Sequence, residues 1–249
     1  MPSYVTCNNQ QHIHFTGHSW IAGQAGGPGR GPLTEAPGGF RDLYRAVPYS
    51  SVGTAPSWRA PNLGDAKTAN TTPATLTGRR DNLTFYGIGG ATSGTYIDPT
   101  NYVLQTKSYR PDILVWLTGV NDWSGGVDVT PGGIFDTNTE TYLSTFQADF
   151  PASQVIVCSV TPRNEQYTLV GPHFLDGGDT WPGNDRLRER AQLHGYVYAD
   201  IINPLLQLEI ANNTPSPGAL TFYSYDDLHW LEPGKALLGA ILMTFFRFV

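Results

Sequence analysis

Five short apolar runs, separated by stretches with helical spacing, constrain the fold of this chain most. The runs are His12 to Gly17, Leu83 to Ile88, Ile113 to Thr118, Val155 to Val160 and Tyr196 to Asp200. Such continuous runs are typical of strands that are buried on both faces of a parallel sheet. Helical spacing occurs at Gly39 to Val47, Asn101 to Ser108, Thr139 to Phe150 and Asn184 to His194, and a last helix is expected to begin near Pro233. This alternation predicts an α/β doubly wound sandwich around a five-stranded parallel sheet, with a site at the carboxyl ends of the strands.

Chain length and composition predict one domain that covers residues 1–249. With 249 residues, 40% of them hydrophobic and 14% charged, the chain can bury a large single core. Residues 23–80 are rich in Gly, Pro, Thr and Ala and are much longer than an ordinary connection, so we expect an insertion that wraps the surface beside the site. A second loop, Pro162 to Gly183, is expected to shape a substrate pocket.

Charge and hydropathy exclude several partners. The net charge is −6 with only three lysines, and the arginines are dispersed apart from Arg186, Arg188 and Arg190, so nucleic acid is not an expected partner. The apolar stretch Ala236 to Phe246 is too short to span a bilayer, which needs about 20 residues, and is interpreted as a last helix packed on the sheet. The sequence does not indicate an oligomeric state.

The N-terminus and the cysteines bear on the compartment. Residues 1–11 lack the pattern of a signal peptide. The few lysines and the many Gly, Pro, Thr and Asn residues favour an extracellular or virion-surface protein. Cys7 and Cys158 lie in or beside two different predicted strands, and two buried thiols are expected rather than a disulfide.

A serine follows the first of the five apolar runs. Ser19 comes two residues after Gly17, so it is expected at the carboxyl end of a strand, where a helix begins. A serine there exposes its Oγ, and its own N–H can face an oxyanion. A helix N-cap serine would show the same spacing.

An acid and a histidine lie close together near the other end of the chain. Asp226 and His229 have the spacing D-x-x-H, which lets an aspartate reach Nδ1 of the histidine while Nε2 points into a site. Asp227 is the second choice for the orienting group, and a solvated turn before the last helix is the alternative. Together with Ser19, the pair supplies a nucleophile, a general base and an orienting carboxylate.

Two further motifs supply hydrogen-bond donors. Gly90 lies in a glycine cluster after the second of the five apolar runs, where backbone N–H groups can approach a ligand closely. Asn121 follows the third run in a G-x-N-D turn, and its amide can donate to an oxyanion. A tight turn with positive φ at Gly90, or a turn stabilised by the Asn121 side chain, would explain the same patterns.

These four motifs together resemble the SGNH subgroup of the GDSL esterases and lipases. Ser19 matches the serine of block I, Gly90 the glycine of block II, Asn121 the asparagine of block III, and Asp226 with His229 the D-x-x-H pair of block V. The resemblance covers essentially the whole chain. It implies a flavodoxin-like three-layer α/β/α sandwich and hydrolysis of acyl esters through an acyl-enzyme, without a metal or a cofactor.

The chain departs from this family at two positions. Position 18 is His where the block usually has Asp, and position 230 is Trp where a proline commonly follows the histidine. Residues 17–23, G-H-S-W-I-A-G, also look like the start of sialate O-acetylesterase and acetylxylan esterase relatives. This similarity favours small-molecule or carbohydrate esters with acetyl or other short acyl groups. Aromatic walls for such substrates are expected from Trp20, Trp123, Trp181 and Trp230.

Other functions compete with ester hydrolysis. His12-x-His14 on a strand, with His18 beyond, could bind a metal, but no second ligand pair has convincing spacing. The glycine run from Gly87 fails the dinucleotide spacing G-x-G-x-x-G because position 92 is Thr. A non-hydrolytic carbohydrate-binding protein, with tryptophans such as Trp58 as platforms, and an acyltransferase that uses the same residues both remain open.

Overall fold

The computed structural model describes residues 2–8, 11–18, 83–160, 181–201 and 232–249, with Ile21, Phe40, Leu43 and Pro204. Its centre is a parallel sheet with the order β3-β2-β4-β5-β6. The strands are β2 (Ile13–Gly17), β3 (Leu83–Gly87), β4 (Ile113–Leu117), β5 (Gln154–Cys158) and β6 (Val197–Ala199). Each lies within two residues of its predicted bounds. The order is that of a flavodoxin-like sheet, and it confirms the predicted fold class.

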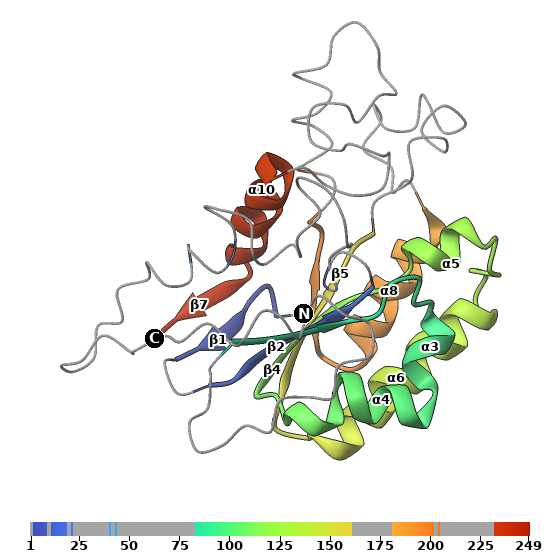
Figure 1. Ribbon diagram of the computed structural model, residues 1–249, viewed down its shortest axis with the longest axis horizontal. Coiled ribbons are helices and arrows are strands. Elements are labelled where there is room, and N and C mark those ends of the chain that lie inside the picture. The colour runs from blue at the N-terminus through green and yellow to red at the C-terminus, as the bar shows by residue number, and fades with distance from the viewer. Residues whose placement is uncertain are drawn as a thin grey trace, which may run out of the picture.

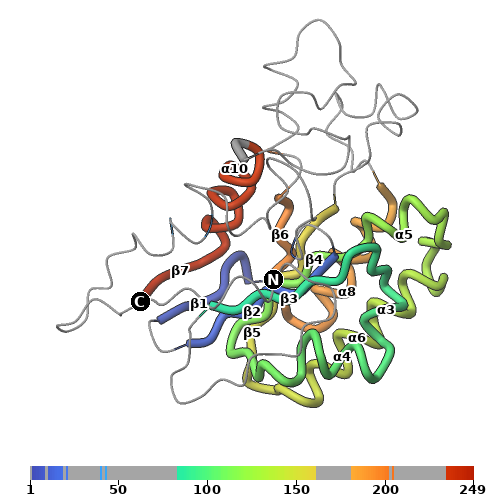
Figure 2. Tube along the Cα trace, viewed as in Figure 1, coloured from blue at the N-terminus to red at the C-terminus, as the bar shows by residue number. Residues whose placement is uncertain are grey.

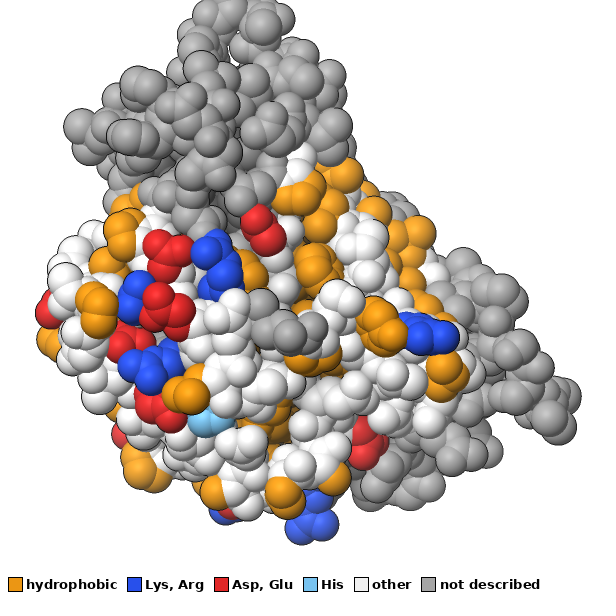
Figure 3. Space-filling model, turned by 180° about the vertical axis from the view of Figure 1, so that it is seen from behind, with side chains coloured by type: hydrophobic (Ala, Val, Ile, Leu, Met, Phe, Trp, Pro, Cys, Tyr) orange, Lys and Arg blue, Asp and Glu red, His pale blue; other side chains and the backbone are white. Residues whose placement is uncertain are grey.

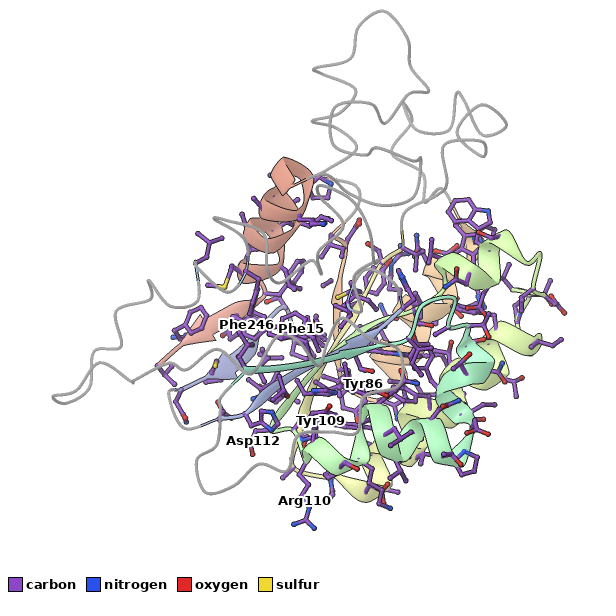
Figure 4. All side chains as sticks on the ribbon, viewed as in Figure 1. Phe15, Tyr86, Tyr109, Arg110, Asp112 and Phe246 are labelled. Atoms are coloured by element: carbon purple, nitrogen blue, oxygen red, sulfur yellow. The ribbon has the colours of Figure 1, made fainter. Side chains whose placement is uncertain are left out.

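One face of the sheet is covered by α10 (Glu232–Met243), with Ile21 and Phe40 beside it. Side chains alternate along each strand, so Phe15 of β2 points to this face. Its ring lies 4.8 Å from that of Phe40, in an edge-to-face arrangement. Figure 4 shows Phe15 and Phe246 together on the α10 side of the sheet and Tyr86 and Tyr109 on the other side.

The second face carries α3 (Ser93–Ile97), α4 (Pro99–Gln105), α6 (Ile134–Asp149) and α8 (Pro182–Leu193), as Figure 1 shows, and the 3-10 helix η3 (Lys107–Tyr109) follows α4. The short helix α5 (Val120–Ser124) follows β4. Trp116, which is fully buried, stacks on Tyr142 of α6 at 4.3 Å. The sheet thus lies between two layers, as a three-layer sandwich requires.

A second, two-stranded sheet joins segments from the two ends of the chain. β1 (Val5–Cys7) pairs in parallel with β7 (Phe246–Phe248), and Figure 2 shows the two strands side by side, away from α3 and α6. The prediction of one helix from Ala236 to Phe246 is therefore wrong at its end, because α10 stops at Met243 and Phe246 begins a strand. Cys7 and Cys158 are both buried thiols, as expected, in the apolar cluster on the α10 side.

Ion pairs link α6 and α8 at the surface. Arg190 of α8 binds Asp136 of α6 through two contacts of 2.6 Å and reaches Glu140 at 3.3 Å. Figure 3 shows acidic and basic side chains interleaved in one patch beside a histidine. Since each sign of charge is paired with the other, this face does not form a continuous basic surface. Within the described ranges, every helix is too short or too polar to cross a bilayer.

Candidate active site

The carboxyl ends of three neighbouring strands lie in one row at the edge of the sheet. Gly17, the last residue of β2, is in register with Gly87 of β3 and with Leu117 of β4. The segments that follow these strands therefore leave the sheet side by side. This is where ligands bind in open α/β sheets, next to the point at which the strand order reverses.

The chain leaves β2 through a turn that only glycine permits. A Cβ at Gly17 would lie 2.7 Å from Leu117 O and 2.9 Å from Ile21 Cγ1, so a larger residue would push the turn away from β4. The Ile21 N–H donates to His18 O at 2.9 Å, which closes the turn. The predicted nucleophile Ser19 and its neighbour Trp20 lie outside the described residues, between these two groups.

The chain leaves β3 through a turn that includes Gly90. The Ala91 N–H donates to Ile88 O at 3.1 Å, and Gly90 has φ of +75°, the left-handed value of the third residue in a type II turn. Gly89 and Gly90 are exposed, and a Cβ at either would meet nothing within 4 Å. Among the described residues, no acceptor binds the Gly90 N–H. Among the described residues, Gly89 and Gly90 therefore border unfilled space at the edge of the sheet.

The third turn, after β4, brings Asn121 to the same place. Gly119 has φ of +106° and begins α5, so Asn121 lies in the first turn of that helix. Asn121 Nδ2 donates to Ala91 O at 2.8 Å. A carbonyl oxygen can only accept, so the amide nitrogen must face it, and the second amide hydrogen remains for another acceptor. The structure thus joins Asn121 to Ala91, the residue that follows Gly90, while the role of both residues as oxyanion donors stays a prediction.

Sequence reasoning missed the aspartate that supports this arrangement. Asp122 is 1% exposed and accepts the Ser93 N–H at 2.8 and 3.0 Å and the Ser93 hydroxyl at 2.6 Å. Burial raises the pKa of Asp122, and the hydrogen bonds from Ser93 oppose that rise. The signal was present, because Asp122 is the last residue of the G-x-N-D motif.

Two of the predicted substrate-binding tryptophans stack on each other beside α5. Trp123 and Trp181 have ring centroids 5.4 Å apart and an angle of 7° between their planes. Trp181 is 4% exposed and fills the space against Gly119 and Gly183, so it has no open face for a sugar ring here. Trp123 is half-buried and is the tryptophan of this pair that a substrate can reach. Trp20 and Trp230 lie outside the described residues.

The histidines that suggested a metal site bind a threonine instead. His12 Nε2 and His14 Nδ1 lie 2.6 and 2.8 Å from Thr84 Oγ1, and His14 Nε2 contacts Gln105 O. His14 is fully buried, and this burial, with His12 nearby, lowers its pKa to about 3. Across the described part of the chain, no three His, Cys, Asp or Glu side chains gather into a metal-binding group.

The acid and base predicted near the C-terminus, Asp226 and His229, lie outside the described residues, as does the alternative Asp227. The next described element is α10, which begins at Glu232. Its Leu238 and Leu242 are buried against the sheet. The role of Asp226 and His229 in a triad with Ser19 therefore stays a prediction.

Comparison with known proteins agrees with this geometry. No family model and no curated protein sequence matches the chain. A protein of Parabacteroides merdae described as a GDSL-like lipase superposes with a TM-score of 0.59 and 16% identity, over 97% of each chain. An acetylxylan esterase gives 0.58 and 17% identity, over 94% of this chain and 98% of the other. A GDSL-like lipase of Bacteroides thetaiotaomicron gives 0.54 and 15% identity, over 94% and 87%.

These similarities span nearly the whole chain at low identity, and they agree with the observed strand order. The chain therefore has the α/β fold of the SGNH/GDSL hydrolases.

Proposed function

We propose that the chain is a serine-dependent carboxylic ester hydrolase of the SGNH/GDSL superfamily. The observation that carries this proposal is the hydrogen bond from Asn121 Nδ2 to Ala91 O, because it joins the turn of Asn121 to the turn of Gly90. A backbone N–H and an amide at adjoining turns, if both face one oxygen, would stabilise a tetrahedral oxyanion. The fold shared with esterases supports the same reaction class.

In the proposed acylation step, Ser19 Oγ attacks the ester carbonyl while His229 Nε2 takes the hydroxyl proton. Asp226 accepts the Nδ1–H of His229 and so fixes the tautomer that can act as a base. The negative charge that forms on the carbonyl oxygen is bound by the N–H groups of Ser19 and Gly90 and by the Asn121 amide. Collapse of this intermediate releases the alcohol, which receives the proton from His229.

Deacylation repeats these steps with water as the nucleophile. His229 takes a proton from water, the hydroxide attacks the acyl carbonyl, and the acid leaves as the Ser19 hydroxyl is restored. If a sugar hydroxyl replaced water, the same residues would catalyse acyl transfer.

We further propose acetyl or other short acyl esters of carbohydrates as substrates. The G-H-S-W-I-A-G start at residues 17–23 supports this class, and among the proteins with this fold is an acetylxylan esterase. Trp123 is half-buried two residues after Asn121, and we expect it to line the substrate side of the site. Its indole offers a flat apolar face of the kind that sugar rings stack on.

The test is initial-rate hydrolysis of p-nitrophenyl acetate and longer esters by the wild type and by Ser19→Ala, each with and without EDTA. We expect Ser19→Ala to lose activity to the background level, since removing the nucleophile of a triad costs about 10⁶-fold in kcat. EDTA should have no effect. The matched control is Ser144→Ala, which removes an exposed serine of α6 and should keep the wild-type rate.

The acyl and alcohol parts of the substrate are tested in parallel. Acetate release from acetylated xylo-oligosaccharides checks the carbohydrate assignment, and transfer of acetyl from p-nitrophenyl acetate to deacetylated oligosaccharides checks for a transferase. Full activity in Ser19→Ala, or its loss on chelation, would contradict the serine mechanism. A wild type that is inert in both assays would favour a binding protein.

A further inference from the structure

Two hydrogen-bonded links join the turn after β3 to the turn after β4. The first link is Asn121 Nδ2 to Ala91 O at 2.8 Å. The second is the Asp122 carboxylate, which accepts the N–H and the hydroxyl of Ser93. One link would leave the two turns able to pivot about it, whereas two links at adjacent residues fix their relative orientation.

The second link is anchored in the core. Ser93 Oγ donates to Asp122 at 2.6 Å and accepts from Asn138 Nδ2 of α6 at 3.1 Å. α6 is 16 residues long, and its Phe135, Leu143 and Phe146 are fully buried. The carboxylate therefore connects both turns to a helix that is held by the apolar core.

The chemistry at Asp122 suits a fixed carboxylate. Ser93 presents two donors to it, and an ionised carboxylate accepts both with either oxygen. Asparagine has the same shape but only one acceptor oxygen, and its NH₂ group would face a donor. Burying a charged group costs free energy, so the hydrogen bonds from Ser93 must offset this cost for the carboxylate to stay ionised.

We infer that Asp122 is the positioning residue of the oxyanion hole: its carboxylate holds Ser93 so that the Gly90 N–H and the Asn121 amide face the same oxygen. This inference rests on the proposed function, because it deepens the account of the same site. Asp122 does not contact the substrate and acts through Gly90 and Asn121.

The first test is Asp122→Asn, assayed with p-nitrophenyl acetate. Removing one oxyanion donor outright typically costs about 10²–10³-fold in kcat, and misplacing the donors should cost less, about 10–100-fold. KM should change by less than about twofold, because the donors act mainly on the transition state. Ser93→Ala removes the hydroxyl link but keeps the backbone N–H, so its kcat should lie between that of Asp122→Asn and the wild type.

The matched control is Asp136→Asn. Asp136 is also 1% exposed, but it lies on α6 and pairs with Arg190. We expect it to lower Tm while leaving kcat within twofold of the wild type at a temperature where both variants are folded. An equal loss of kcat in Asp136→Asn would overturn the inference, since any buried aspartate would then have the same effect.

A double-mutant cycle separates positioning from a general effect on folding. If Asp122 acts through the donors, Asp122→Asn should reduce kcat much less in an Asn121→Ala background than in the wild type. The inference would be overturned if the kcat losses of Asp122→Asn and Asn121→Ala multiplied fully in the double variant, or if Asp122→Asn had the kcat of the wild type. In either case Ser19→Ala still reports on the hydrolase.

A second measurement does not depend on ester hydrolysis. Amide NMR of the ¹⁵N-labelled protein should show the Gly90 and Ala91 resonances shifted in Asp122→Asn and unchanged in Asp136→Asn. Unshifted resonances would contradict the positioning role even if the wild type proved inert towards esters. Shifted resonances with an inert wild type would instead support Asp122 as the support of the turn and contradict the proposed reaction.

Discussion

Two clusters of buried polar side chains lie on the helix α6 side of the sheet, and they differ in what lies beyond them. Near the amino ends of the strands, Thr84 binds His12 and His14. At the carboxyl ends, Asp122 binds Ser93. Both clusters satisfy their hydrogen bonds internally, yet only one of them borders open space.

The histidine cluster is sealed. His14 is fully buried, and its ring stacks on Tyr109 at 4.0 Å. Because Gln105 O can only accept, His14 Nε2 must carry the proton, and Nδ1 then accepts from the Thr84 hydroxyl. Both ring nitrogens of His14 are therefore used inside the protein, and neither can bind a ligand.

The aspartate cluster is equally buried but supports an exposed turn. Asp122 is 1% exposed, while Gly89 and Gly90, four and three residues before Ser93 in the sequence, are open to solvent. Its hydrogen bonds link the turn that carries Gly90 to the turn that carries Asn121. The comparison teaches that a buried polar network indicates a functional site when it fixes groups that a ligand can reach, and a structural one when it is closed on itself.

The largest expected effect on stability comes from a substitution at Gly119, in the turn that carries Asp122 of the aspartate cluster. Gly119→Ala would place a Cβ 2.7 Å from the Trp181 ring and 2.9 Å from Val160, in a backbone with φ of +106°. Backbone strain costs about 1–3 kcal/mol, and overpacking costs about 1–3 kcal/mol. We expect the free energy of unfolding, measured by urea denaturation, to fall by roughly 2–6 kcal/mol. Gly126→Ala, where φ is +64° and a Cβ meets nothing within 4 Å, is the control, and an equal loss there would contradict the packing argument.

Acid should disrupt the sealed cluster next. His14 has a pKa of about 3 in the folded protein and 6.5 as its ordinary value, so between these pH values the unfolded chain binds one more proton. The stability of the folded protein with a neutral His14 is fully present above pH 6.5, and it is lost as the pH falls towards 3. By pH 4.5 the loss should reach about 3 kcal/mol, at about 1.4 kcal/mol per pH unit.

The measurement is the slope of the unfolding free energy against pH between 6.5 and 4.5. His14→Gln cannot titrate and should flatten this slope, whatever its absolute stability. A wild type and His14→Gln with the same slope would show that the ring can be protonated in place.

The sequence predicted the strands of the central sheet well because β2, β3 and β4 are buried along their whole length, so their runs have few exposed polar positions. It predicted the helices less well where tertiary contacts form them. α3 and α5 have five residues each, and the Ser93–Asp122 hydrogen bonds support the start of α3. α6 begins at Ile134 rather than at the predicted Thr139. The prediction was late because Gly132 and Gly133, directly before the helix, resemble a loop. The pairing of β1 with β7 joins the two ends of the chain and leaves no local signal.

Sequence motifs singled out Gly90 and Asn121 but not the contacts that hold their turns. Gly90 and Asn121 stand in recognisable patterns, and the register of β2, β3 and β4 brings their turns together. The role of Asp122 depends on Ser93, 29 residues earlier in the chain, and a contact between distant segments is not visible in one sequence. Burial also decided the tryptophans, since Trp123 and Trp181 look alike in sequence but only Trp181 is fully enclosed.

The substitution with the smallest effect on stability should give the sharpest test of the turn that the aspartate cluster supports. Gly90 and Gly126 both have positive φ, +75° and +64°, and both face open space. Alanine at either position should lower the free energy of unfolding by about 1–2 kcal/mol, the cost of a left-handed residue with a Cβ. Only Gly90→Ala should also reduce kcat for p-nitrophenyl acetate, by up to about 10²-fold, because it shifts a donor and narrows the space beside it. Equal activity in the two variants would mean that the turn after β3 contributes shape but no oxyanion donor, and Asn121 would then remain as the donor to test.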